Sequence, residues 1–587
     1  MLGCSSGFCN PLGTQDKQIL RSPRRPTRRP EPLGGAPKPQ DSGAQVAQND
    51  NRRFGGDYSV YANLKTGLAM LAILFLLASV AHGATGGVVS GIVKGPGGAP
   101  FEGAFVRARN QARKKITFNV LSDQQGRYRI ENLSQGEYEV WATAIGYKAE
   151  PRTGVKVVAG VPPSVEFTLQ KSMVQWSELD NAQAEALLPE GPGKKEFLGQ
   201  CTGCHGFQDR IAGGKRRDEA GWRAVMSLMK MVGPERSFKN DQENAAILSY
   251  LTSVFGPNSK LPRSPEELPE YQKVKHNPPS GEATKIVYVD YELPAANRFA
   301  WSAAPDEHGN VWIPYHQNAN AIGKLDPNTG EIQDFKVPNQ GVAGVHSAVA
   351  APDGTVWLVE NRTRKIGKWD PRTQAITEYQ NPGEGSENTV RIDPKGFVWA
   401  SGGPLIRFDP ETKKFFPYSE TTHTYGITLD REGSLWFAEY TKDGQIGKVD
   451  IKTGKLTKYS PPTPNAQPRR IQIDPDGIVW FGEFEAGKIG RFDPKTESFK
   501  EYPLPGDRAT PYALGIDANN NIWYSSEFQS IIGRLDPKSG HVTVYPSPYT
   551  DSINMREFFL DAQGRFWYGT TGNHKVGYFY LASGNAK

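Results

Sequence analysis

Two thiols and an imidazole lie within the short segment Gln200-Cys201-Thr202-Gly203-Cys204-His205. Two residues between the cysteines place the thiols about one helical turn apart, and the imidazole follows the second thiol directly. This spacing is the attachment pattern of a c-type haem, in which both thiols bond to the haem vinyl groups and the histidine binds the iron. The same residues could form a redox dithiol, which needs a βαβ context, or half of a zinc site, which needs two more ligands. The sequence favours one covalent haem c, held by Cys201, Cys204 and His205.

The segment around this motif has helical periodicity. Residues Asn181 to Leu188 and Lys194 to Gln200 precede the motif, and Gln242 to Leu251 has the apolar spacing of an amphipathic helix. Residues 178–258 resemble class I cytochrome c domains, through Trp222, Met229 and Gly233 at the spacing Trp-x6-Met-x3-Gly. This resemblance implies Met229 as the second iron ligand, with Met226 and Met231 as neighbouring alternatives. An iron with both axial positions filled carries electrons and leaves no position for oxygen chemistry.

The N-terminal part of the chain indicates export. Residues 1–65 are rich in Pro, Gly, Gln, Asn and Arg, which predicts a disordered extension. Residues 66–84 contain an apolar run that follows Lys65 and ends in small residues, the order of a signal peptide; an uncleaved membrane anchor is the alternative. A signal so far from Met1 suggests that the true start lies later, and Cys4 and Cys9 would then be absent. The mature protein is expected in the periplasm, without a disulfide framework.

Residues 86–172 alternate apolar and polar side chains in short runs separated by Gly and Pro, which predicts a small β-sandwich. The segment resembles the carboxypeptidase regulatory-like family, through Gly91-Ile92-Val93, Gly126-x-Tyr128, Gly136-x-Tyr138 and Gly146-Tyr147. This resemblance implies a structural or carbohydrate-binding module without catalytic residues.

A long internal repeat follows a Pro-rich linker at residues 259–283. A tryptophan after a turn recurs at intervals of 37 to 45 residues, at Trp312, Trp357, Trp399, Trp436, Trp480, Trp523 and Trp567. Such a period, with about four short strands per unit, predicts a seven-bladed β-propeller over residues 284–587. The last unit lacks an outer strand, and the orphan strand from Lys285 to Val289 is expected to complete it. The fold class is therefore multidomain and mainly β: a β-sandwich, a small α-helical cytochrome c domain and a seven-bladed propeller.

The repeat resembles the virginiamycin B lyase family, through the phrase x-G-I-x-x-D-P-D-G-x-V-W-F-x-E, seen at Tyr425 to Glu439 and Arg469 to Glu483. The resemblance implies that the residue eleven positions before each blade tryptophan faces a central channel. In this chain those residues are Trp301, His346, Asn388, Tyr425, Arg469, Tyr512 and Arg556.

The same resemblance implies a lyase that uses histidines in two successive late blades and a carboxylate that helps to hold Mg²⁺. Tyr512 and Arg556 stand at those histidine positions, and Thr570 replaces the last carboxylate. His346 and Glu360 keep both residue types within one blade and are the candidate catalytic pair. Magnesium is expected only if the protein is a lyase.

The channel residues suggest an organic ligand. Arginines among aromatic rings suit a carboxylate or phenolic molecule, because guanidinium groups pair with anions and stack on rings. The alternative is that Arg469 and Arg556 pair with Glu439 and Glu483 and only fill the channel.

Charge excludes one class of partner. The net charge is +6, from 69 basic and 63 acidic residues, and much of the excess lies near the N-terminus, so no nucleic-acid partner is predicted. Membrane contact is expected only through a possible anchor at residues 66–84. Three functions remain open: an electron-transfer haem protein whose propeller binds an anionic aromatic ligand or a redox partner protein, a lyase or hydrolase at the propeller channel, and a module that binds the cell wall or a partner.

Overall fold

A computed structural model describes residues 86–582, except 203–205, 233–239, 275–278, 318, 340, 384, 386, 507 and 551–554. The predicted extension and signal or anchor at residues 1–84 lie outside the described residues, as do Cys204 and His205. The described part is mainly β, with many sheets and few helices. None of its helices is both long and apolar enough to span a bilayer.

The first nine strands form the predicted sandwich, with a core that contains Val93, Ile130 and Val140. Alternate residues of β4 and β5 are buried, which explains the period of two in the sequence. The nine strands of the sandwich are β1 (Gly87–Lys94), β2 (Phe105–Asn110), β3 (Ile116–Leu121), β4 (Arg127–Leu133), β5 (Gly136–Ala144), β6 (Tyr147–Lys148), β7 (Arg152–Val157), β8 (Phe167–Thr168) and β9 (Gln170–Lys171).

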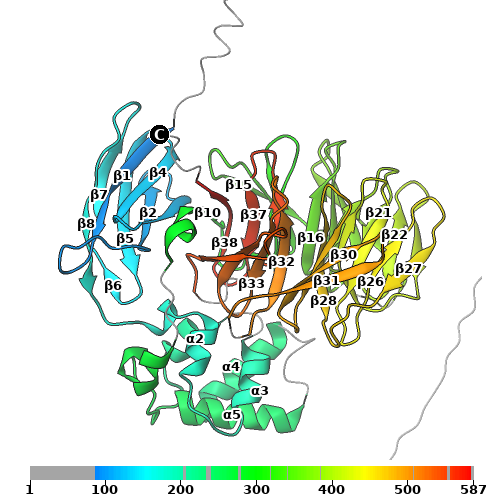
Figure 1. Ribbon diagram of the computed structural model, residues 1–587. Coiled ribbons are helices and arrows are strands. Elements are labelled where there is room, and N and C mark those ends of the chain that lie inside the picture. Colours follow the sequence, from blue (N-terminus) through cyan, green and yellow to red (C-terminus); the bar gives the residue numbers. More distant parts are fainter. Residues whose placement is uncertain are drawn as a thin grey trace, which may run out of the picture. The chain divides into compact units, whose positions relative to one another are not determined.

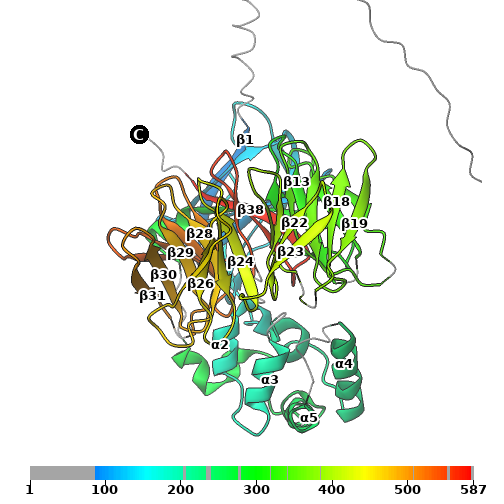
Figure 2. The same ribbon diagram turned by 90° about the vertical axis from the view of Figure 1, so that its right-hand side faces the viewer.

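A helical unit follows, and Figure 2 shows α3, α4 and α5 gathered together. Its core holds an aromatic group in which Phe197 contacts Phe207, Tyr250 and Phe255, with ring centroids 5.5–5.7 Å apart. The main helices are α2 (Asn181–Ala186), α3 (Lys194–Cys201), α4 (Glu219–Val232) and α5 (Asp241–Phe255). Short helical turns are Trp176–Glu178, Gln208–Ala212, Pro265–Glu267, Pro269–Lys273 and Gly281–Lys285. The helices predicted before and after the cysteine motif are confirmed.

A close approach of two helices and a longer C-terminal segment characterise this helical unit. Gly193 adopts a φ of 89°, and a Cβ there would lie 2.2 Å from the Ala246 carbonyl oxygen, so α3 and α5 can approach closely. The predicted linker at 259–283 is partly wrong: Leu261 and Tyr271 are buried in the helical core because their apolar side chains find a surface there. The unit therefore continues to about Val274, which packs against the same core.

The repeats form seven sheets, as predicted for the propeller, and Figure 1 shows them following one another in colour order. Blade 1 comprises β11 (Phe299–Ala300), β12 (Ala304–Pro305), β13 (Val311–His316), β14 (Ala321–Leu325) and β15 (Ile332–Lys336). Blade 2 comprises β16 (Val345–Ala350), β17 (Val356–Glu360), β18 (Lys365–Asp370) and β19 (Ala375–Gln380). Blade 3 comprises β20 (Val390–Ile392), β21 (Val398–Ala400), β22 (Leu405–Asp409) and β23 (Lys414–Tyr418).

The remaining blades have the same order of strands. Blade 4 comprises β24 (Thr424–Leu429), β25 (Leu435–Glu439), β26 (Ile446–Val449) and β27 (Leu456–Tyr459). Blade 5 comprises β28 (Pro468–Ile473), β29 (Val479–Glu483), β30 (Lys488–Asp493) and β31 (Ser498–Pro503). Blade 6 comprises β32 (Pro511–Ile516), β33 (Ile522–Ser526), β34 (Ile531–Leu535) and β35 (Val542–Pro546). Blade 7 comprises β36 (Phe559–Leu560), β37 (Phe566–Thr570), β38 (Lys575–Leu581) and β10 (Ile286–Glu292).

The repeated tryptophan anchors a turn in six of the blades. Its Nε1 donates to the carboxylate of an aspartate six residues earlier, at 2.7–3.2 Å, and Trp480 with Asp474 is one such pair. Asp474 Oδ1 also accepts the backbone N–H groups of Asp476 and Ile478, so one carboxylate fixes both the turn and the indole. Blade 2 has Ala351 at this position. The repeat is therefore a hydrogen-bonding unit as well as an apolar one.

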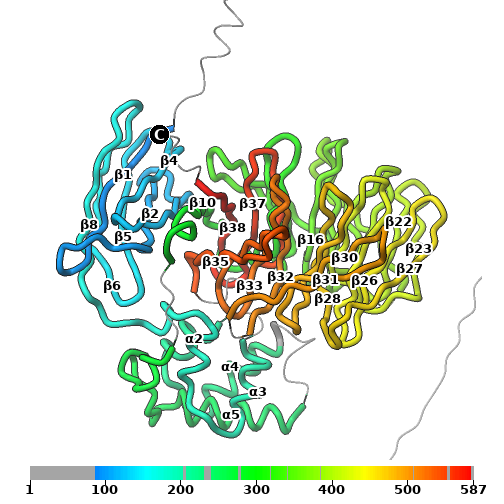
Figure 3. Tube along the Cα trace, in the orientation of Figure 1, coloured from blue at the N-terminus to red at the C-terminus, as the bar shows by residue number. Residues whose placement is uncertain are grey.

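Strand β10 closes the ring and also joins it to the sandwich (Figure 3). Tyr288 of β10 lies opposite Phe579 of β38 on one side and Asn119 of β3 on the other, with antiparallel pairing in both cases. The prediction that this strand completes the last blade is confirmed. Its pairing with the sandwich was not predicted, and it makes one continuous sheet of the two domains.

Candidate functional site

Six of the seven predicted channel side chains contact one another near the propeller axis, where the first strands of successive blades meet. A β-bulge interrupts the pairing of the first strand with the second in blades 2, 4, 5 and 6, at His346, Tyr425, Arg469 and Tyr512. A bulge re-aims side chains away from simple alternation. The bulges therefore direct these four side chains toward the axis, where all four are buried.

One layer of this cluster holds two arginines on one carboxylate. Glu527 lies 3.2 Å from Arg556 Nη2 and 3.8 Å from Arg469 Nη1, and all three side chains are at most 5% exposed. The guanidinium carbon of Arg469 lies 3.4 Å from the ring centre of Tyr512. The alternative in which these arginines pair with Glu439 and Glu483 is wrong, because both arginines pair with Glu527, and a bulge in the first strand of blade 5 re-aims Arg469.

Glu439 and Glu483 have other neighbours. Glu439 forms an ion pair of 2.7 Å with Lys458 Nζ. Burial, followed by the charge of Glu501, raises the pKa of Glu483 to about 8. Both carboxyl groups therefore interact with residues of the outer strands of their own blades.

A second layer repeats the two-to-one arrangement, and the sequence did not reveal it. Glu557 Oε1 lies 2.8 Å from Arg391 Nη2 and 3.2 Å from Arg470 Nη1, and Arg470 also donates to the Thr389 hydroxyl at 2.8 Å. Simple alternation would turn Arg470 away from Arg469. The bulge instead puts both guanidinium groups near Tyr425, at 5.0 and 5.1 Å from its ring centre. The tandem Arg469-Arg470 was the signal available in the sequence.

The two tyrosines at the axis share a hydrogen bond between their hydroxyl groups. Burial and the neighbouring Tyr512 raise the pKa of Tyr425 to about 12. Burial also favours the neutral form of Tyr512, but the charges of Arg469 and Arg556 outweigh it and lower the pKa of Tyr512. Tyr512 is thus the more acidic phenol of the pair.

The two candidate catalytic residues have different neighbours among the described residues. His346 is buried against Trp301 and Tyr425, and its Nε2 lies 3.4 Å from the Tyr425 hydroxyl. Desolvation, followed by nearby positive groups, lowers the pKa of His346, so its imidazole is neutral at pH 7. Glu360 instead accepts a hydrogen bond from Thr363. Burial, with a contribution from Glu378, raises the pKa of Glu360 to about 8.

Trp301, Asn388 and Thr570 differ in their surroundings. Trp301 lies 4.3 Å from the Arg556 guanidinium carbon, so it belongs to the axis cluster. Asn388 accepts a hydrogen bond of 3.0 Å from Asn361. Thr570, at the position of the missing carboxylate, donates to the Lys575 carbonyl at 2.9 Å and is held within its own turn.

The helical unit brings a cysteine of the motif and two methionines to one core. Cys201, Met226 and Met229 are all partly buried and pack against the cluster that contains Phe197 and Trp222. Cys204 and His205 lie outside the described residues, as does the side chain of Met231. Within the described ranges there is no group of three or more His, Cys, Asp or Glu side chains arranged to hold a metal ion.

Contacts link the helical unit with the loop that carries Glu527. The backbone N–H of Ala182 donates to the Phe528 carbonyl at 3.1 Å, one residue after Glu527. Arg508 of the propeller pairs with Glu185 and lies 3.9 Å from the Phe528 ring centre. The loop that supplies the carboxylate to Arg469 and Arg556 is therefore held on its other side by α2.

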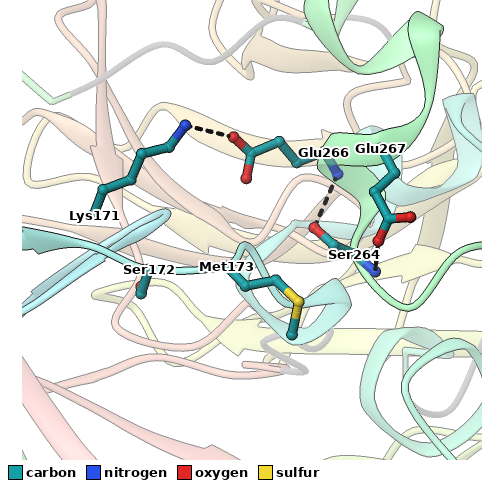
Figure 4. Close-up of a pocket in the computed structure, with 6 residues that line it drawn as sticks. All are labelled: Lys171, Ser172, Met173, Ser264, Glu266 and Glu267. Atoms are coloured by element: carbon teal, nitrogen blue, oxygen red, sulfur yellow. Dashed lines mark hydrogen bonds and ion pairs between the residues drawn. The ribbon is translucent and has the colours of Figure 1, made fainter.

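A surface pocket lies away from both groups of residues, where the sandwich meets the end of the helical unit (Figure 4). Lys171 forms an ion pair of 3.0 Å with Glu266, and the Ser264 hydroxyl accepts the Glu266 N–H. These polar groups satisfy one another, and no predicted site residue lines the pocket. It is not a candidate site.

Comparisons with known proteins find family matches for two segments of the chain. Residues 404–584 match the virginiamycin B lyase family, and residues 88–170 match the carboxypeptidase regulatory-like domain. Neither match includes residues 178–258, so the likeness of that segment to cytochromes c stays a prediction. No curated protein shows significant similarity to this sequence.

Solved structures of lyases are similar to the propeller half of the chain. A virginiamycin B lyase from Staphylococcus aureus has 25% identity and a TM-score of 0.46, over 50% of this chain and 98% of the lyase. A streptogramin B lyase has 27% identity and a TM-score of 0.47, over 52% of this chain and 100% of the lyase. The family matches thus support a carboxypeptidase regulatory-like domain and a propeller fold that is like that of virginiamycin B lyase.

Proposed function

We propose that the propeller axis binds a small organic ligand and does not catalyse its conversion. The observation that carries this proposal is the buried layer in which Arg469 and Arg556 converge on Glu527 among aromatic rings. Few convergent polar groups within aromatic walls are typical of ligand sites. The family match over residues 404–584 supports a lyase-like or binding function, and the geometry favours binding.

A lyase would need a base positioned beside an acidic C–H bond and a group to stabilise the charge that develops. The neutral imidazole of His346 has the form of a base. The Nε2 atom of His346 lies near the Tyr425 hydroxyl, and the Glu360 carboxyl accepts a hydrogen bond from Thr363. Loss of a positioned base lowers a rate by about 10² to 10⁴-fold, so we expect negligible turnover.

The test is incubation with quinupristin, the compound present in a solved structure of a catalytically inactive virginiamycin B lyase from Staphylococcus aureus, followed by chromatography of that compound. We expect binding of organic ligands at the axis, measured by calorimetry, and an unchanged quinupristin peak. Ring opening that His346→Ala abolishes would overturn the proposal in favour of a lyase. His308→Ala, in an exposed turn of blade 1, is the matched control.

A second function is proposed for the helical unit, which we infer carries one covalent haem c for electron transfer. Cys201 and Cys204 would bond to it, while His205 and Met229 would bind the iron. Cys201 and Met229 are partly buried against one apolar core, and thiol and thioether sulfurs suit this group, so the residues present fit it. When bound, the haem would supply single-electron transfer. The chain's own part is to exclude water with Phe197, Trp222 and their neighbours and to hold Met229 on α4.

Haem staining after denaturing electrophoresis tests the attachment, with Cys201→Ala as the variant that should lose the stain. Met229→Ala is expected to lower the reduction potential, because a thioether ligand raises it. Met226→Ala, one turn earlier on the same helix, is the matched control and should leave the potential nearly unchanged. A stain absent from the wild-type protein, expressed with a cytochrome maturation system, would refute the assignment. Export to the periplasm and a redox partner protein belong to the same proposal.

A further inference from the structure

The loop that carries Glu527 contributes two neighbouring side chains to the propeller axis. Glu527 lies 3.2 Å from Arg556 Nη2 and 3.8 Å from Arg469 Nη1, and its side chain is 5% exposed. The next residue, Phe528, packs against the buried aromatic group that contains Tyr512. A displacement of this loop would therefore move a buried charge and an aromatic ring of the axis at the same time.

Residues 508–510 hold this loop from within blade 6. The Thr510 carbonyl accepts the Glu527 N–H at 3.2 Å, and the Thr510 hydroxyl accepts the Phe528 N–H at 3.2 Å. Two residues earlier, Arg508 places its guanidinium carbon 3.9 Å from the Phe528 ring centre. A guanidinium group is attracted to the face of an aromatic ring, so Arg508 restrains the Phe528 side chain.

Helix α2 of the helical unit contacts the same loop from outside the propeller. Glu185 of α2 forms an ion pair with Arg508, and the Ala182 N–H donates to the Phe528 carbonyl at 3.1 Å. The Glu185 side chain is 11% exposed. A carboxylate that is largely removed from water depends more on its counter-ion than an exposed one does, so Glu185 favours the position in which Arg508 pairs with it.

Other contacts fix the helical unit on blades 6 and 7. The Thr550 hydroxyl donates to the Ser177 carbonyl, which precedes α2 in the sequence. After α2, the buried Gln208 donates to the Thr550 carbonyl at 3.4 Å, and Arg210 donates to the Gly572 carbonyl at 3.3 Å. The chain is thus held on the propeller both before and after α2, which makes α2 a fixed support for the loop.

We propose that Arg508 and Glu185 are positioning residues, through which α2 of the helical unit holds Glu527 at the propeller axis. Arg508 joins the two sides, since it pairs with the helix and lies over the Phe528 ring of the loop. The inference rests on the proposed binding function of the axis and adds its regulation by the helical unit. A movement of α2 would change the charges at the axis without any contact between α2 and a ligand.

Tyr512 reports the position of Glu527, because charges beside the phenol control its ionisation. Burial and the Glu527 carboxylate favour the neutral phenol, but the charges of Arg469 and other neighbouring arginines lower the pKa of Tyr512. Loss of Arg508 then has two opposite consequences. Removal of its positive charge would by itself raise the pKa of Tyr512, whereas release of Glu527 from the axis would lower it.

An absorbance titration of the full chain, from about pH 7 to 11, measures the tyrosinate form. The step that Tyr512→Phe removes belongs to Tyr512, and Glu527→Gln shows the full effect of losing the carboxylate. We expect Arg508→Gln to lower the pKa of Tyr512 by about half a pH unit. Arg534→Gln is the matched control, because Arg534 of the same blade pairs with Glu282, outside the loop, and it should leave this step unchanged. A raised or unchanged pKa of Tyr512 in Arg508→Gln would overturn the inference.

Amide hydrogen exchange measures release of the loop directly and decides the matter if Arg508→Gln does not fold. Exchange at Glu527 and Phe528 should become at least about threefold faster in Glu185→Gln. Glu266→Gln is the matched control, since Glu266 is a carboxylate of the same unit that pairs with Lys171 of the sandwich. Unchanged exchange in Glu185→Gln would overturn the inference. Neither measurement needs a ligand, so a failure to bind organic ligands would refute the proposed function alone.

Discussion

Two glutamates at equivalent places in their blades make stability depend on pH. Glu360 and Glu483 each follow a blade tryptophan by three residues, and both are buried. Burial and a neighbouring carboxylate raise the pKa of each to about 8, from an ordinary 4.5. The folded state therefore retains protons that the unfolded chain releases.

The direction of the pH dependence follows from the difference in bound protons between the folded and unfolded states. A carboxyl group with a raised pKa in the folded state stabilises it fully below the unfolded pKa, and this contribution is lost as pH rises toward the folded pKa. We expect the free energy of unfolding to fall between about pH 4.5 and 8, by on the order of a few kcal/mol for the two groups together. Urea unfolding at pH 5, 6.5 and 8 measures this.

The variant Glu483→Gln should remove part of that pH dependence and raise stability at pH 8. Glu439→Gln is the matched control, because Glu439 occupies the equivalent place in blade 4 but forms an ion pair with Lys458. Equal pH dependence in wild type and Glu483→Gln would contradict the assignment.

The sequence predicted which residues lie at the propeller axis better than it predicted their interaction partners. The distance of eleven residues before each tryptophan selected Arg469, Tyr512 and Arg556, which do meet at the axis. It missed Arg470 and Glu527, because a bulge and a turn, which have no strict sequence signal, bring them there. The sequence period predicts the direction of side chains in regular strands, but not where a bulge interrupts the alternation.

At the scale of elements, the Asp–Trp hydrogen bond explains why the repeat survives variation in the strands between its turns. Asp474→Ala would remove the acceptor of the Trp480 indole and of two turn amides. Hydrogen bonds to charged groups contribute about 1.5–3 kcal/mol, so we expect a loss of about 2–3 kcal/mol of unfolding free energy. Chemical denaturation followed by tryptophan fluorescence checks this.

The neighbouring Asp476→Ala is the matched control, because Asp476 is exposed in the same turn. Its effect should stay within about 0.5 kcal/mol, as for other surface substitutions. Similar losses in both variants would mean that general turn polarity, and not the indole contact, is responsible.

The glycine of the repeated Ile-Gly-Lys/Arg phrase also has a structural cause. A Cβ at Gly490 would lie 2.2 Å from the Phe481 ring, and one at Gly447 would lie 2.2 Å from the Phe437 ring. The second and third strands of a blade can therefore pair closely only where the side chain is absent. The repeated phrase is visible in the sequence, but only the side-chain packing in the structure explains why it contains a glycine.

At the scale of the whole molecule, a buried polar junction joins the sandwich to the ring. Asn119 of β3 donates to Asp290 Oδ2 at 2.7 Å, and the Tyr568 hydroxyl of blade 7 donates to Asp290 Oδ1 at 2.7 Å. Asn119 and Asp290 are both 2% exposed. One carboxylate in β10 thus connects two domains that the sequence predicted as separate units.

We expect Asn119→Ala to weaken the last blade as well as the sandwich. It leaves one buried carboxylate oxygen short of a donor, which costs about 1–3 kcal/mol. Amide hydrogen exchange should become faster in β10 and β38. Asn110→Ala is the matched control, since the Asn110 side chain bonds backbone groups of its own turn, and it should leave exchange in β38 unchanged.

The alternation of the strands and the tryptophan period predicted both β domains, but the shared sheet could not be foreseen. Strand β10 is apolar on both faces, with six of its seven residues buried, which fits any central strand. The sequence of such a strand does not specify which partner lies on each side. Only the pairing of β10 with both β3 and β38 distinguishes a ring closure from a junction.

The pairing of β10 also sets an order in time. Its partner in the sandwich is synthesised long before it, whereas its partner β38 follows about 280 residues later, near the end of the chain. At about 5–20 residues per second, the second edge of β10 waits on the order of 15–60 s for that strand. An exposed strand edge invites pairing with other chains, and early pairing with β3 protects one of the two edges during that interval. The sandwich therefore covers one edge of β10 while the propeller is still incomplete.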